Sequence, residues 1–145
     1  MALRRILSPS SRPDVGLALL RVVLGAVFAA HGAQKLFVYG TDAVTGSFTQ
    51  MGAPLPDITG PLVSGIEFAG GMMLMLGLFG RIVATALALD MLAAMVLVHI
   101  PHGFFLPGGV EFVLALFAGA LAIALTGPGM ISLDAALMRR RLAHQ

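Results

Sequence analysis

Ionisable side chains stand inside, or at the ends of, long apolar stretches of this sequence, where a charge is expensive and usually has a function. They are Arg21, His31, Lys35, Glu67, Asp90, His99 and Glu111. Titratable groups beside apolar walls suit the binding of the polar head of a hydrophobic molecule, for example the carbonyl oxygens of a quinone. We predict that Glu67 and His31 are catalytic groups that exchange a proton. The head of the substrate is predicted to contact Lys35, His99 and Glu111.

Arg21 and Asp90 are predicted to form a buried ion pair. Counted at about 1.5 Å of rise per residue from the same end of a helical bundle, the two side chains reach similar depths. A lone charge at such a depth would cost at least about 2.5–3.5 kcal/mol. We therefore predict that the pair has a structural role and holds two apolar runs together. The alternative is that Arg21 and Asp90 take a direct part in proton or substrate handling.

Metal and haem ligation are the alternatives for the histidines. His99 and His102 have i,i+3 spacing and Glu111 follows closely, a pattern that a metal ion could use. Pro101 lies between the two histidines, however, and disturbs that helical spacing. On an ideal helix His99 also faces away from the core, which disfavours a bis-histidine haem with His31. We expect no metal site and disfavour haem; quinone is the candidate cofactor, and plain interfacial histidines bonded to the backbone remain an alternative.

Four apolar runs must position these groups: residues 15–37, 61–79, 82–100 and 109–126, each about long enough to span a bilayer as a helix. Of the 145 residues, 58% are hydrophobic and 11% are charged, and the mean hydropathy is +0.94. A net charge of +2 is too small to coat a nucleic-acid duplex, and the absence of cysteine excludes disulfides and thiolate ligands. The sequence predicts an all-α integral membrane four-helix bundle, a single domain over residues 1–145 whose main partner is the lipid bilayer.

The ionisable residues share helical faces with small side chains. In the first run, Arg21, Gly25, Gly32 and Lys35 fall close to one line along a helix. Small side chains allow helices to pack closely within a membrane. The charges are therefore predicted to point inward, and the large aliphatic side chains toward lipid.

Basic residues predict the orientation of the bundle. With four spans, both termini and the turn at residues 80–81 lie on one side, which holds Arg4, Arg5, Arg12, Arg81, Arg139, Arg140 and Arg141. The other side holds only Lys35, at the end of the first run. By the positive-inside rule both termini are cytoplasmic and the loop at 39–60 is periplasmic. The tail from Ser132 to His144 is predicted to form a short interfacial helix, capped by Ser132.

Several short motifs, in the same order along the chain, resemble those of the DoxX family. They are Arg21 with Leu24-Gly25, His31-Gly32 and Lys35-Leu36; Glu67 with Gly70-Gly71, Leu76-Gly77-Leu78 and Arg81; His99 with Gly103-Phe104-Phe105, Gly108-Gly109 and Glu111; and Gly127-Pro128-Gly129 with Ser132-Leu133-Asp134. The resemblance covers about residues 15–135.

The resemblance implies a four-helix, multi-pass protein of the bacterial inner (plasma) membrane. Members of this family are usually described as oxidoreductases, and one branch is associated with thiosulfate oxidation coupled to membrane quinone. Another branch is linked to a membrane complex with superoxide dismutase and a sulfurtransferase, which serves oxidative-stress resistance. Soluble redox enzymes are therefore the partners that the resemblance suggests, and a homo-oligomer stays open.

Three functions are compatible with these observations. We favour a redox-linked membrane subunit that binds a quinone or similar apolar molecule in the outer half of the bundle. The second is a noncatalytic anchor for soluble redox enzymes, in which the inward charges only specify helix packing. The third is a carrier for a small solute. Whether the chain is itself an enzyme stays open, because it has no flavin or nicotinamide motif; an enclosed pocket touching Glu67 and His31 would favour the first function.

Overall fold

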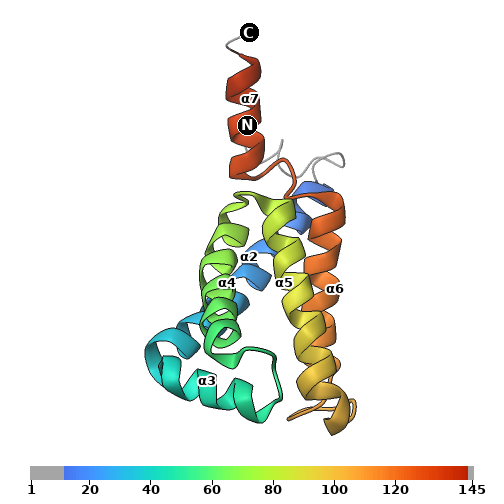
Figure 1. Ribbon diagram of the computed structural model, residues 1–145. Helices are drawn as coiled ribbons and strands as arrows, with labels where there is room; N and C mark the ends of the chain where they lie inside the picture. The colour runs from blue at the N-terminus through green and yellow to red at the C-terminus, as the bar shows by residue number, and fades with distance from the viewer. Residues whose placement is uncertain (1–11, 144–145) are drawn as a thin grey trace.

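The structure, a computed structural model, describes residues 12–143, and all of the regular structure within that range is helical. The α-helices are α2 (Arg12–Ala33), α3 (Thr41–Gln50), α4 (Pro56–Leu76), α5 (Gly80–Ala94), α6 (Glu111–Thr126) and α7 (Leu133–Leu142) (Figure 1). Two π-helical segments, Gln34–Tyr39 and Met95–His99, continue α2 and α5, and a 3-10 turn (Ile100–His102) follows the second. Arg4 and Arg5, which contribute to the predicted charge asymmetry, lie outside the described residues.

Four helices pack around one core in the ring order α2, α4, α5, α6. Each contributes a large side chain that is almost completely buried: Phe28, Leu74, Leu87 and Ile123. Because lipid tails are as apolar as these side chains, close packing rather than the exclusion of water holds such helices together. The predicted all-helical fold is confirmed.

Three helical stretches are long and apolar enough to cross a membrane: Arg12–Tyr39, Pro56–Leu76 and Gly80–His102. Helix α6 is also apolar but has 16 residues, which is about 24 Å of helix and shorter than a typical hydrocarbon core. Helix α4 begins earlier than the predicted residue 61, because Pro56 fits the first turn of a helix, where its missing N–H is not needed. The fourth span and the orientation of the termini remain predictions.

Helices α2 and α4 approach each other at the distance of backbone contact. A Cβ atom placed on Gly32 would lie 2.3 Å from the backbone nitrogen of Phe68, and one placed on Gly71 would lie 2.4 Å from that of Ala29. Real carbon atoms do not come so close, so both positions accept glycine alone. This contact agrees with the predicted packing of small residues, and it fixes the register of α2 against α4.

The turn between α4 and α5 is tied to the first turn of α7. Gly77 ends α4 in the left-handed conformation (φ +68°), and its N–H donates to the carbonyl of Leu74. The Asp134 carboxylate accepts hydrogen bonds from the N–H groups of Phe79 and Gly80, at 2.9 and 2.8 Å. It therefore satisfies donors that the start of α5 would otherwise leave unpaired.

Helices α3 and α7 lie outside the four-helix ring, at opposite ends of it (Figure 1). Helix α3 lies across one end, whereas α7 projects beyond the other. The predicted C-terminal helix is present, and its cap is the predicted one: the Ser132 hydroxyl accepts from the N–H of Ala135 at 3.2 Å. Its placement in the membrane interface stays a prediction.

Candidate functional site

A partly buried ion pair joins the π-helical segment after α2 to α4, near the α3 end of the bundle. The Nζ atom of Lys35 lies 2.6 Å from both carboxylate oxygens of Glu67. The Glu67 side chain is 4% exposed and that of Lys35 is 26% exposed. Lys35 stands on the π-helical segment that continues α2, and such segments are frequent at functional sites. The cation beside Glu67 is thus the lysine.

Two cavities flank this ion pair, and we call them together the polar chamber. One, of about 230 Å³, is bounded by α3, α4 and the end of α5; the other, of about 190 Å³, is bounded by α2, α5 and α6. Lys35, Glu67, Ala94 and His99 line both of them, and His31 lines the second. The remaining walls are mostly apolar. The structure therefore brings four of the five predicted catalytic and substrate-binding residues to one place.

Asp90 adds a second carboxyl to the polar chamber. It lines the larger cavity together with Glu67 and Lys35. Its Oδ2 atom is buried and has no hydrogen-bond partner among residues 12–143. This oxygen gives the chamber an acceptor atom that the described residues do not use.

The two histidines of the chamber are held differently. His99 Nδ1 lies 2.8 Å from the carbonyl oxygen of Gly108. A carbonyl oxygen only accepts, so Nδ1 carries the proton, and in the neutral ring Nε2 is then an acceptor. The His31 ring packs against Phe112, with the ring centroids 6.2 Å apart. Either imidazole could exchange a proton with a molecule in the chamber.

Two residues at the end of α3 line the larger cavity and were not among the predicted site residues. Phe48 of α3 and Met51, the residue that follows this helix, line the larger cavity together with Lys35 and Glu67. The signal in the sequence was that these two residues share a face of a short helix, although nothing in the sequence indicated which surface that helix would cover.

Glu111 does not line the polar chamber. Its Oε1 atom accepts a hydrogen bond from the backbone N–H of Leu106, at 2.7 Å. Glu111 is the first residue of α6, and this hydrogen bond holds the preceding loop against the first turn of that helix. Its predicted contact with substrate stays a prediction, and the structure places the carboxylate in its own loop rather than among the residues that line the chamber. His102 is likewise outside the chamber, with Nδ1 2.7 Å from the carbonyl of Val98.

The predicted ion pair between Arg21 and Asp90 is not formed. The Arg21 Nη2 atom donates to the carbonyl of Ile131 at 2.6 Å, and the guanidinium lies beside Gly77, at the end of α4. Asp90 instead lines a cavity together with Glu67. Glu67 precedes Gly77 by ten residues, which is about 15 Å along α4. The register between α2 and α4, which the glycine contacts fix, thus places the two charges at different depths.

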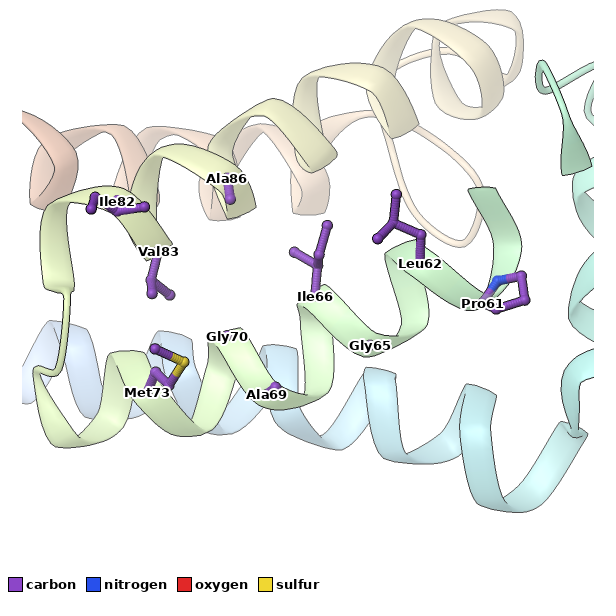
Figure 2. Close-up of a pocket in the computed structure, with 10 residues that line it drawn as sticks. All are labelled: Pro61, Leu62, Gly65, Ile66, Ala69, Gly70, Met73, Ile82, Val83 and Ala86. Atoms are coloured by element: carbon purple, nitrogen blue, oxygen red, sulfur yellow. The ribbon is translucent and has the colours of Figure 1, made fainter. Parts of the chain in front are cut away.

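A larger groove, of about 440 Å³, lies between α4 and α5 and differs from the polar chamber in chemistry. Figure 2 shows its residues, among them Gly65 and Gly70 on α4 and Ala86 on α5. Within residues 12–143, no ionisable side chain lines it. Ala86 stands one helical turn before Asp90, so one end of this apolar groove comes near the chamber.

The fold and the site define an α-helical membrane protein with a charged pair and cavities inside its bundle. The family pattern of DoxX matches residues 16–100, and the chain belongs to the DoxX family.

Relatives of similar length come from several bacteria. The chain is 32% identical to "Putative oxidoreductase CatD" of Bacillus subtilis (strain 168), over 83% of this chain and 86% of that protein. It is 31% identical to "Uncharacterized membrane protein Rv3486" of Mycobacterium tuberculosis (strain ATCC 25618 / H37Rv), over 96% and 90% of the two chains. An "Uncharacterized protein" of Haemophilus influenzae (strain ATCC 51907 / DSM 11121 / KW20 / Rd) is 31% identical, over 81% and 87%. No solved structure matches the chain.

Proposed function

We propose that this protein is a redox-linked subunit of the bacterial inner membrane that binds the polar head of a quinone, or of a similar apolar molecule, in the polar chamber. The observation that carries the proposal is the Lys35–Glu67 ion pair with a cavity on either side. Replacing a buried ion pair by apolar side chains is often neutral or stabilising. A bundle with a purely structural role would therefore have little reason to keep the pair beside empty space.

The side chains of the chamber match the needs of a carbonyl head. The Lys35 ammonium group can donate to a carbonyl oxygen, and Glu67, Asp90 or His99 can exchange protons with it. Reduction of a quinone consumes two electrons and two protons, one proton at each oxygen. The chain has no cysteine, and we assign the electrons to a separate redox enzyme at the membrane. The apolar groove between α4 and α5, which reaches Ala86 one helical turn before Asp90, would accommodate part of an apolar tail.

The proposal includes four spans with both ends of the described chain in the cytoplasm, and labelling tests this topology. The sequence contains no cysteine, so Thr45→Cys in α3 and Ala143→Cys after α7 each introduce a single thiol. In intact spheroplasts, a membrane-impermeant thiol reagent should label the cysteine at 45 at once. The cysteine at 143 should react only after the membrane is permeabilised, and the opposite pattern would reverse the orientation.

Filling the polar chamber should abolish binding of the head group. Ala94 lines both cavities, so Ala94→Leu occupies space in each. Ala115→Leu is the matched control, because Ala115 is exposed on α6. With decylubiquinone as the probe, at about 100 times its Kd, wild type and the control should gain about 2.7 kcal/mol in stability by mass action. Thermal unfolding in detergent measures this gain, and an equal gain in Ala94→Leu would contradict the proposed site.

Glu67→Gln separates binding from proton exchange. Glutamine keeps the size and hydrogen bonding of the side chain but cannot take up or release a proton in the same way. We expect this variant to retain decylubiquinone and to fail to restore oxidative-stress or sulfur-oxidation phenotypes in a deletion strain. If Glu67→Gln and Glu67→Ala both restore the phenotype fully, the chain is an anchor for redox enzymes instead.

A further inference from the structure

A cavity of about 480 Å³ lies at the base of α7, where that helix meets the start of α5. Two arginines, Arg81 and Arg141, line it together with an apolar wall that includes Ile82, Leu137 and Met138. None of these residues belongs to the polar chamber. We propose that this cavity binds the phosphate headgroup of an anionic phospholipid, with the two guanidinium groups at the phosphate and the apolar wall against the adjoining lipid.

Arg81 is held in place by the end of a neighbouring helix. Its Nη1 and Nη2 atoms donate to the carbonyl oxygens of Leu125 and Thr126, at 3.1 and 3.3 Å. A guanidinium has five N–H donors, so these two bonds leave three for another acceptor. Because the group is already positioned, little conformational entropy is lost when it binds an anion.

Asp134 also lines the cavity, and its negative charge would repel an anionic ligand unless other groups neutralise it. Both of its oxygens accept hydrogen bonds from the first turn of α5, through the N–H groups of Phe79 and Gly80. The positive end of the α5 dipole therefore offsets its charge. The helix terminus is occupied by Asp134, and the two arginines are the groups that remain for a phosphate.

The place of the cavity favours a lipid over a free phosphate ion. It lies at the end of the bundle where the apolar stretch of α5 begins, and its wall is open: Ile82 is 72% exposed and Met138 61% exposed. Exposed apolar side chains next to arginines match a molecule that carries both a phosphate and acyl chains. Basic segments at such a position are attracted to anionic lipid by about 1 kcal/mol per side chain.

Lipid titration of the purified full-length chain, followed by native mass spectrometry, tests this site. Arg141→Gln removes one cation from the cavity, and Arg140→Gln is the matched control: it removes the same charge from the same helix but does not line the cavity. We expect wild type to bind phosphatidylglycerol in preference to phosphatidylcholine. The apparent affinity for phosphatidylglycerol should fall about five-fold in Arg141→Gln and stay near the wild-type value in Arg140→Gln.

Three results would overturn the proposal. Equal losses in the two variants would mean that α7 attracts anionic lipid only through its overall charge. Equal affinity of the wild type for phosphatidylcholine would remove the role of headgroup charge. Thermal stabilisation by inorganic phosphate as large as that by phosphatidylglycerol would assign the cavity to a free anion rather than to a lipid.

Discussion

Lys35→Met is expected to lower the free energy of unfolding by about 3–5 kcal/mol, the usual loss when one member of a buried ion pair is removed. The substitution leaves the Glu67 carboxyl, which is 4% exposed, without the ammonium group that lies 2.6 Å away. Methionine is an unbranched side chain of similar length, so the loss comes from charge rather than from packing. Unfolding by sodium dodecyl sulfate in mixed micelles measures the change.

Glu67→Gln, which removes the other member of the pair, should lower the free energy of unfolding by less than Lys35→Met. In Glu67→Gln the remaining charge is on Lys35, whose side chain is 26% exposed and flexible enough to extend toward a polar environment. Combining Glu67→Gln with Lys35→Met should recover part of the stability lost in Lys35→Met, because no lone charge then stays buried. A double variant less stable than Lys35→Met alone would show that the pair is not the source of the loss.

Gly71→Ala is expected to destabilise the bundle by about 3 kcal/mol or more, at the upper end of the range for overpacking. The new methyl group would meet the backbone nitrogen of Ala29 at 2.4 Å and the carbonyl oxygen of Gly25 at 2.6 Å. Backbone atoms cannot rotate away as a side chain can, so α2 and α4 would have to separate. Separation would also move Lys35 from Glu67, and the midpoint of thermal unfolding in detergent should fall sharply.

Gly65→Ala provides the matched control on the same helix. A Cβ atom at Gly65 has no neighbouring atom within 4 Å, so the added methyl group meets open space. Alanine favours helix over glycine by about 1 kcal/mol, and this variant should be as stable as the wild type or slightly more stable. Similar losses in both variants would contradict close backbone packing as the reason for glycine at position 71.

The sequence predicted which segments are helical, because apolar length and the 3.6-residue period are local properties. It could not predict the register between helices that are far apart in the chain. The partner of Arg21 depends on that register: the glycine contacts place Arg21 beside Gly77 rather than beside Asp90. Depth counted along single helices misses such a shift.

His99 shows a second limit, one that concerns local geometry. Nine residues separate it from Asp90, which on an ideal α-helix places the two side chains on opposite faces. The π-helical segment Met95–His99 is wider per turn, and with it both residues line the same cavity. Proline at position 101 signals that the helix must end there, but no simple residue pattern predicts that the last turns widen first.

Helix α3, which covers one side of the polar chamber, has fewer buried contacts than the helices α2 and α4 that carry the ion pair. Val44 is the one residue of α3 that is buried, whereas the backbones of α2 and α4 are in direct contact. Elements with few buried contacts open locally at a free energy well below that of global unfolding. For the proposed function this means that a head group would enter the chamber by local opening of the ten-residue helix α3, while the Lys35–Glu67 ion pair keeps its geometry. The rate of access and the strength of binding would then be set by different parts of the chain.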